Sequence, residues 1–264
     1  LGSGAIAGSN FAIDRAYTAK ALGFKAACAN SMDGVSDRDF AADFCYFSAL
    51  SSVHLSRMAE EIIMYATTEF NLIDIDDSFA TGSSLMPHKK NPDSLELIRG
   101  KTSRVVGDLV SLFVLLKGLP MTYNRDLQED KEPLFDALKT TKDSIAVMTL
   151  CIHGMTANKD RMRLAVEESF MPAVEMAEYL TVKGMPFREA HEIVGKIVRD
   201  CEDKKRSISS LKTNELKKYS ELFDKDVLNY ITTQNIFKKR KTTGAASFYE
   251  VRKQIKKEKL YISL

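Results

Sequence analysis

A glycine–serine turn and a lysine–asparagine cluster stand close together in residues 81–99, and their side chains could carry out carbanion chemistry. Removing a proton next to a carboxylate places negative charge on the carboxylate oxygens, so such a site needs preorganised hydrogen-bond donors. Lys89 and Asn91 could supply these donors, while an activated Ser83 removes the proton. Because serine is a weak base, its alkoxide would need strong stabilisation. The alternative interpretation is a polar surface loop with two solvated lysines.

The same stretch should run directly into a helix. Asn91 suits an N-cap position, and Pro92 suits the first helical position. The amino end of a helix carries a partial positive charge and commonly binds anions. We therefore expect residues 81–92 to close over a substrate that is rich in carboxylates.

A second group of polar side chains lies in residues 119–132, between two predicted long helices. Tyr123, Gln128 and Lys131 offer a phenol, an amide and an ammonium that could orient a polar substrate. Gln128 and Lys131 are three residues apart, so they share a face if the chain is already helical there. The alternative is a charged loop that connects two helices.

The histidines indicate no further site. His54 lies on an apolar stripe and is expected to be a core or interface residue. His88 sits inside the 81–92 loop, while His153 and His191 lack partners in the sequence. The sequence contains no zinc-binding motif, dinucleotide fingerprint or phosphate-binding loop, so we predict no metal and no cofactor.

The elements that position these residues are predicted to be long helices, because helical periodicity dominates the chain. Ser36 and Asp39 resemble a capping box, which predicts a helix over 36–69. A second helix should follow Pro92 and end at Gly118 and Pro120, and a third should span 129–156. The apolar stripe of the first helix includes Phe40, Phe44, Phe47, Met58, Ile62 and Tyr65. The second helix has a coiled-coil-like seam, suited to packing in a long bundle, made of Ile98, Thr102, Val105, Leu109, Leu112 and Leu116.

These helices predict an all-α fold. Each is about 25 residues or longer, which is well above the usual mean. Such helices seldom bury their apolar faces within one chain of this size, so we expect an oligomeric bundle. The composition shifts near residues 157–159, after which the helices become shorter and charge density rises. The prediction is a central helical bundle domain over 1–157 and a smaller helical C-terminal domain over 158–264.

The overall charge of +2 gives no reason to expect a nucleic-acid partner. Residues 238–264 hold nine Lys or Arg and only two Glu, and a basic tail of this kind can bind nucleic acid or acidic lipid. A solvated helix face is the preferred interpretation, with Phe248, Val251, Ile255 and Tyr261 packed inward. We therefore predict neither a nucleic-acid partner nor a membrane partner.

The four cysteines are widely spaced and form no CxxC motif. This pattern is typical of reduced thiols in a cytoplasmic protein rather than of disulfides or zinc ligands. No signal peptide is visible, and the uncharged stretch 109–116 is too short to cross a membrane. The prediction is a cytoplasmic protein.

Residues 82–92 (Gly-Ser-Ser-Leu-Met-Pro-His-Lys-Lys-Asn-Pro) resemble the signature loop of the fumarase/aspartase superfamily, whose members release fumarate by β-elimination. The continuation over 93–99, together with 116–120 and 123–131, is similar to the family of argininosuccinate lyases and delta-crystallins. The opening residues 1–8 and the segment 184–188 also fit, and the similarity fades after about residue 210.

The resemblance implies roles for particular residues. Ser83 would take the proton from the succinyl carbon, and Lys89 and Asn91 would stabilise the aci-carboxylate intermediate. Glu96 would support the family's catalytic histidine. The residues implied in binding argininosuccinate are Tyr123, Gln128 and Lys131.

The family resemblance also implies the reaction and the assembly. Argininosuccinate would be cleaved to arginine and fumarate without a cofactor. The family folds as a helical homotetramer with a central bundle, and each active site takes residues from three subunits. These properties are expectations for this chain.

Some features depart from the family pattern. The N-terminal domain and the catalytic histidine are expected upstream of Leu1, so this segment alone is expected to be inactive. Ser9-Asn10-Phe11 replaces the usual Asn-Pro, and His88 stands where glutamine is common. The main alternative is a delta-crystallin-like or inactive structural relative. A fumarate-releasing lyase with another substrate and a nucleic-acid-binding bundle are the remaining alternatives.

Overall fold

The computed structural model describes residues 2–82 and 90–262, and the all-α prediction is confirmed over these residues. Strands are confined there to two short antiparallel pairs. The chain divides into two compact units, Leu1–Ala157 and Asn158–Leu264, which are described separately.

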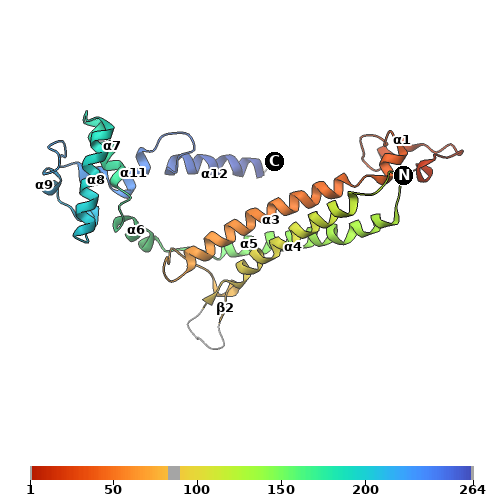
Figure 1. Ribbon diagram of the computed structural model, residues 1–264, viewed down its shortest axis with the longest axis horizontal. Helices are drawn as coiled ribbons and strands as arrows, with labels where there is room; N and C mark the ends of the chain where they lie inside the picture. The colour runs from red at the N-terminus through yellow and green to blue at the C-terminus, as the bar shows by residue number, and fades with distance from the viewer. Residues whose placement is uncertain (1, 83–89, 263–264) are drawn as a thin grey trace. The chain divides into compact units, whose positions relative to one another are not determined.

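The first unit is built on three long helices that pack along one another (Figure 1). They are α3 (Asp39–Ala66), α4 (Asp93–Leu116) and α5 (Lys131–His153). The predicted inward seam of α4 is confirmed where Ile98, Val105 and Leu112 are buried, with Thr102, Leu109 and Leu116 partly buried beside them. The apolar residues that repeat along α4 therefore contribute one side of the bundle core.

The predicted apolar stripe of α3 is only partly buried within this chain. Phe40, Phe47 and Met58 are exposed, whereas Ile62 is buried and Phe44 and Tyr65 are partly buried. The core-facing side of α3 instead carries small side chains, because these let three helices approach closely along their length. The buried residues of α3 are Ala41, Cys45, Ser48, Ala49, Ser52, Ala59 and Ile62.

The predicted helix starts also need correction. Ser36 ends the short helix α2 (Ser31–Ser36) and donates its hydroxyl to the Asp33 carbonyl, so it does not cap α3. An extended Asp37 separates the two helices, and Arg38 occupies the N-cap position without a side-chain cap. Similarly, Asn91 lies in a strand, and the N-cap of α4 is Pro92. Both helices begin later than predicted.

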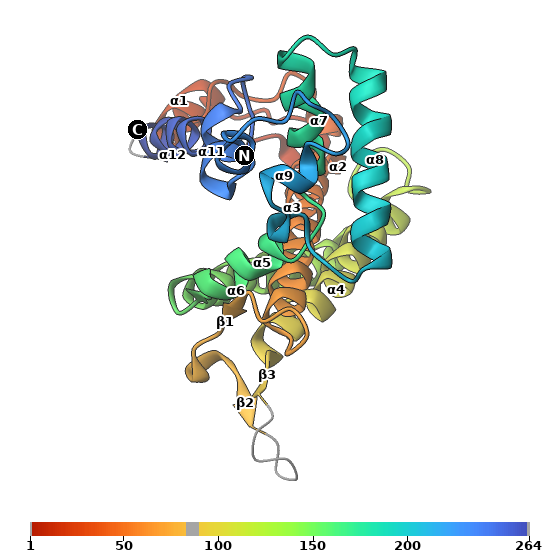
Figure 2. The same ribbon diagram turned by 90° about the vertical axis from the view of Figure 1, so that its left-hand side faces the viewer.

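Short elements close the ends of the first unit. Strand β1 (Ile73–Asp74) pairs with β4 (Thr156–Ala157), and β2 (Thr81–Gly82) pairs with β3 (Lys90–Asn91) at one end of the bundle (Figure 2). A 3₁₀ helix, η3 (Arg125–Asp130), precedes α5, so the predicted helix over 129–156 is shorter at both ends. The other short elements of this unit are η1 (Gly4–Ile6), α1 (Arg15–Ala21) and η2 (Asp77–Phe79).

The second unit has its own core around Tyr179, Phe223 and Ile197, which are fully or almost fully buried. The ring of Tyr179 stacks on that of Phe223, with centroids 6.1 Å apart. The elements are α6 (Lys159–Glu167), α7 (Ala173–Val182), α8 (Phe187–Asp203), η4 (Ile208–Ser210), α9 (Thr213–Leu216), α10 (Val227–Tyr230), α11 (Thr233–Lys239) and α12 (Phe248–Ile262).

The inward packing predicted for the basic tail is wrong. Phe248, Val251, Ile255 and Tyr261 are all exposed, and α12 buries no residue. The helix touches its unit near its start, where the Phe237 and Phe248 ring centroids are 5.4 Å apart. Among the helices that the structure describes, none is long and apolar enough to cross a bilayer.

Candidate active site

Strands β2 and β3 form a fixed base at the ends of the 83–89 segment. Thr81 lies opposite Asn91, and Gly82 lies opposite Lys90. The Thr81 hydroxyl donates to the Asp93 carboxylate at the start of α4, which ties the strand pair to the helix. Asn91 therefore sits two residues before α4. Ser83, Lys89 and His88 lie outside the described residues.

Charges around this base are arranged to hold Lys90. Its Nζ lies 2.5 Å from Asp77 Oδ1 and 3.8 Å from Asp74 Oδ1. The hydrogen bond to Asp77 and the charge of Asp74 raise the pKa of Lys90, so the lysine remains protonated. These ion pairs hold the side chain of Lys90, which lies in sequence between the predicted site residues Lys89 and Asn91.

Glu96 lies in the first turn of α4 and is exposed. An acidic side chain at a helix amino end is favoured by the helix dipole, so its position needs no bound partner to explain it. Its exposed carboxylate is accessible to a group from outside this part of the chain. The neighbouring Arg99 on the same helix is engaged by Glu60 of α3.

The second predicted group gathers around η3 and the start of α5. Gln128 Nε2 donates to the Tyr123 hydroxyl over 2.9 Å, and both side chains are exposed. Lys131 is the first residue of α5, and its Nζ donates to Asp130 Oδ1 over 2.9 Å. Thr122, next to Tyr123, has a φ of 93°, a strained conformation for a β-branched residue. The three predicted residues thus share one small region.

The two predicted groups lie at opposite ends of α4. Asn91 and Glu96 are at its start, whereas Tyr123 and Lys131 follow its end (Figure 1). A helix of 24 residues is about 36 Å long at 1.5 Å per residue. The side chains of one group therefore cannot touch a small substrate held by the other group of the same chain.

The described histidines form no site with either group. His54 on α3 is exposed, so it is not a core residue of this chain, and its alternative placement at an interface stays a prediction. His153 and His191 are also exposed, and the His191 ring lies beside Phe187 with centroids 6.3 Å apart. Within residues 2–82 and 90–262, no group of three or more His, Cys, Asp or Glu side chains could hold a metal ion.

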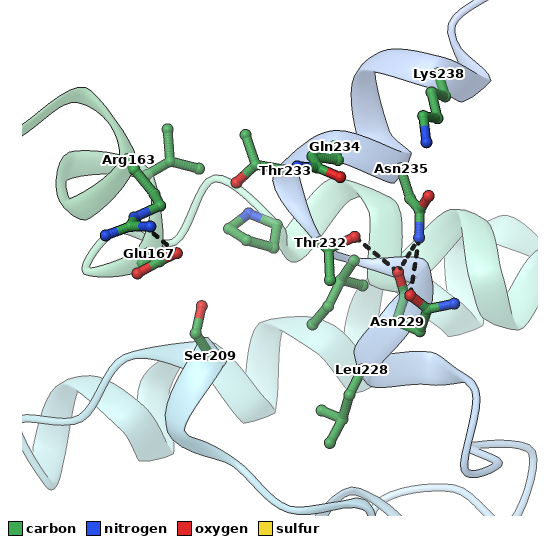
Figure 3. A pocket seen from close by; sticks show the side chains of 13 residues that line it. Arg163, Glu167, Ser209, Leu228, Asn229, Thr232, Thr233, Gln234, Asn235 and Lys238 are labelled. Carbon is green, nitrogen blue, oxygen red and sulfur yellow. Dashed lines mark hydrogen bonds and ion pairs between the residues drawn. The ribbon is translucent and has the colours of Figure 1, made fainter. Parts of the chain in front are cut away.

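A cavity of about 790 Å³ in the second unit contains none of the predicted site residues (Figure 3). Three of its lining residues are joined by hydrogen bonds: Asn235 Nδ2 and the Thr232 hydroxyl both donate to the Asn229 backbone carbonyl, over 2.6 and 3.0 Å. Arg163 on its rim faces Glu167, 3.8 Å away. The cavity is therefore a polar recess that lies apart from both predicted groups in sequence.

The sequence reasoning missed two residues of the second group, Arg38 and Asp130. Arg38 Nε donates to Asp130 Oδ2 over 2.5 Å, and the Asp130 side chain is only 8% exposed. Burial acts to raise the pKa of Asp130, but hydrogen bonds from Lys131 and Arg38 outweigh it and hold the pKa below its ordinary value. The only sequence signal was the charged Ser36-Asp37-Arg38-Asp39 run, and it indicated a helix cap instead.

Comparison with known families supplies the context of these groups. The family model described as Lyase matches residues 1–107, and the one described as Argininosuccinate lyase C-terminal matches residues 170–238. The argininosuccinate lyase of Bacillus subtilis (strain 168) is 48% identical over 263 residues, which cover 100% of this chain and 57% of that protein. The argininosuccinate lyase of Caldanaerobacter subterraneus subsp. tengcongensis is 51% identical over 249 residues, which cover 94% of this chain and 57% of that protein.

The chain thus spans about 57% of the length of these two curated relatives. Among solved structures, a variant of EDDS lyase with bound fumarate matches with a TM-score of 0.85 and 26% identity, covering 100% of this chain and 54% of that one. Two family models and relatives about half identical along almost the whole chain confirm the resemblance carried by residues 82–99, and the chain belongs to the argininosuccinate lyase family of the fumarase/aspartase superfamily.

Proposed function

We propose that the protein is an argininosuccinate lyase, which cleaves argininosuccinate to arginine and fumarate by β-elimination without a cofactor. The observation that carries this proposal is the 48–51% identity to argininosuccinate lyases over 94–100% of the chain. Ser83, Lys89, Asn91 and Glu96, to which the resemblance gives roles in the chemistry, are all present in the sequence.

The proposed reaction follows from the chemistry of those residues. Ser83 takes the proton from the succinyl carbon next to the carboxylate, and Lys89 and Asn91 stabilise the resulting aci-carboxylate. The carbon–nitrogen bond then breaks, which leaves fumarate and arginine. Glu96 supports a histidine supplied from outside this chain's described residues. The proposed substrate-binding residues are Tyr123, Gln128 and Lys131.

We propose that the active site is assembled from several copies in a homotetramer. The roughly 36 Å between the two groups along α4 supports this, because only another copy could bring a second group to the first. Large apolar side chains exposed on all three long helices also favour association. They include Phe47 and Leu50 on α3, Val110 and Phe113 on α4, and Phe135 and Leu138 on α5.

The proposed location is the cytoplasm. All four cysteines are free thiols, with Cys45, Cys151 and Cys201 buried and Cys28 exposed. Free thiols are typical of a reducing compartment. The proposed partners are the small-molecule substrate and further copies of this chain, with no nucleic acid and no membrane.

The proposed function is tested on the complete gene product that contains this chain. Purified protein is incubated with argininosuccinate, and fumarate is followed by its ultraviolet absorbance. We expect fumarate release that is abolished by Ser83→Ala and unaffected by Ser103→Ala, which removes a hydroxyl on an exposed part of α4. A wild-type protein that releases no fumarate would contradict the activity, whereas an active Ser83→Ala variant would contradict only the choice of base.

A further inference from the structure

Asp130 is a buried carboxylate that connects two cations of the second group. Its Oδ2 accepts from Arg38 Nε over 2.5 Å, and its Oδ1 accepts from Lys131 Nζ over 2.9 Å. The Asp130 and Arg38 side chains are 8% and 16% exposed, whereas that of Lys131 is 57% exposed. One cation therefore anchors the carboxylate in the protein, and the other presents its amine to solvent.

Arg38 itself is fixed by the backbone between α2 and α3. Its Nη1 donates to the Val35 carbonyl over 3.2 Å and to the Asp37 carbonyl over 2.6 Å. A guanidinium with three acceptors in fixed directions has little freedom to move. Asp130 therefore receives its hydrogen bond from a rigid donor, and its own position is set by that donor.

The same junction contacts the segment that carries Tyr123. The Ser36 hydroxyl lies 3.9 Å from the sulfur of Met121, one residue before the strained Thr122. Residues 36–38 thus touch both ends of the 121–131 segment. This arrangement gives the short segment a support that its own few backbone hydrogen bonds do not provide.

Lys131 is the residue for which the restriction by these contacts matters most. A lysine has a flexible stem, so an unrestrained ammonium occupies many positions. An ammonium has three N–H donors, and Asp130 accepts from one of them. The others can point toward an anionic ligand, and holding the amine in advance lowers the entropy cost of binding that ligand.

We propose that Arg38 and Asp130 are positioning residues that hold the Lys131 ammonium ready for a carboxylate of the substrate. This inference rests on the proposed function, because Lys131 is there assigned to substrate binding. Arg38 and Asp130 touch no substrate. They act through Lys131 alone, so their loss should weaken substrate binding more than it slows the chemical step.

The contact itself is tested on this chain without any activity. Lysine amines are acetylated with a dilute acylating reagent, and the rate at each site is followed by mass spectrometry. We expect Asp130→Asn to accelerate acetylation of Lys131 severalfold while other lysines react as before. Asp136→Asn is the matched control, because it breaks a second aspartate–arginine pair, between Asp136 on α5 and Arg104 on α4, 2.5 Å apart. An unchanged rate at Lys131 would overturn the proposal, whether or not the protein releases fumarate.

The role is tested by kinetics in the complete gene product. We expect Asp130→Asn to raise KM for argininosuccinate about tenfold while kcat changes much less. Arg38→Met should behave alike and Arg38→Lys should recover part of the loss, which supplies a second route if Asp130→Asn folds poorly. Far-UV circular dichroism checks that each variant is folded. If the Asp130→Asn and Arg38→Met variants instead lost kcat while KM stayed unchanged, the role of the two residues would be merely structural, and the proposal would be overturned. If wild-type protein releases no fumarate but the labelling responds, the contact stands and the proposed function fails.

Discussion

Two aspartates of the first unit show how neighbours decide what a carboxylate does. Asp130 faces Arg38 and Lys131, and its pKa is lowered although burial opposes this. Asp108 on α4 is partly buried against Asp136, and burial followed by the charge of Asp136 raises its pKa to about 6, with Arg104 acting weakly in the opposite direction. Asp108 Oδ2 is also buried without a hydrogen-bond partner among the described residues. The first carboxylate is stabilised by cations, whereas the second binds its proton more tightly than an ordinary aspartate does.

We predict that Asp108→Asn stabilises the chain at neutral and alkaline pH. The pKa of Asp108 is higher in the folded state, about 6, than in the unfolded state, so the folded protein binds this proton more tightly. The stability of the folded state therefore falls as pH rises from about 4 to about 6. The amide imitates the protonated carboxyl and can donate to Asp136. Because solvent screens part of the effect, the expected gain is about 1–2 kcal/mol at pH 8 and close to zero at pH 4. Urea unfolding across this pH range measures it.

Asp143→Asn provides the control for that experiment, since Asp143 is exposed on the neighbouring helix α5. It should leave the pH dependence of unfolding unchanged. An Asp108→Asn variant with the same pH dependence as wild-type protein would contradict the raised pKa of Asp108.

A second prediction at this scale concerns Tyr123. Tyr123→Phe keeps the ring but removes the hydroxyl that accepts from Gln128 Nε2. A hydrogen bond contributes roughly 0.5–1.5 kcal/mol, so we expect KM for argininosuccinate to rise about 2- to 10-fold in the complete gene product. Steady-state kinetics measure this, with the exposed Tyr249→Phe on α12 as the control. No change in KM or kcat would remove Tyr123 from the proposed binding group.

At the scale of helices, the apolar periodicity predicted that the three long helices exist and roughly how long they are. It predicted less well which face of each helix is buried. The second predicted helix kept its seam because Val105 and Leu112 repeat at the heptad spacing that packs against α3 and α5. On α3, both faces are apolar, and the buried face is the one with Ala41 and Ala49 rather than Phe40. The face of α3 with small side chains is the buried one, because small residues let neighbouring helices pack closely. The sequence pattern alone carries no information about which apolar face another surface will cover.

Two glycines should respond in opposite ways to the same substitution. A Cβ at Gly154, where α5 ends, would lie 2.9 Å from Asp76 Cβ and 3.0 Å from the Phe79 ring. Gly154→Ala should therefore destabilise the chain by roughly 1–3 kcal/mol. Gly195 lies inside α8, and a Cβ there would meet no described heavy atom within 4 Å, so Gly195→Ala should stabilise by roughly 0.5–1 kcal/mol. Thermal unfolding measures both signs, and a stabilised Gly154→Ala variant would contradict the tight contact.

At the scale of the whole chain, local sequence could group candidate residues that are close in sequence, but it could not predict contacts between distant ones. Asn91 and Glu96 are near each other because they are neighbours in sequence, and the same holds for Tyr123, Gln128 and Lys131. The contact between Arg38 and Asp130 joins residues 92 positions apart, so no local pattern could indicate it. The separation of the two groups follows from the length of α4. Under the proposed function, a complete site therefore requires a second copy of the chain, and no local sequence pattern describes that contact.

The dependence on assembly leads to a prediction about mixed oligomers. In the complete gene product, Glu96→Gln and Lys131→Met should each lose most activity, since each disables one of the two groups. If a site takes these groups from different copies, mixing the two variants during refolding leaves about a quarter of the sites with both groups intact. Fumarate release from the mixture should therefore exceed that of either variant alone. Gln128→Ala mixed with Lys131→Met is the control, because both residues belong to one group and no copy supplies it intact. Recovery in the control, or none in the first mixture, would contradict a site shared between copies, whereas recovery in the first mixture alone would show that the roughly 36 Å along α4 are bridged by a second copy.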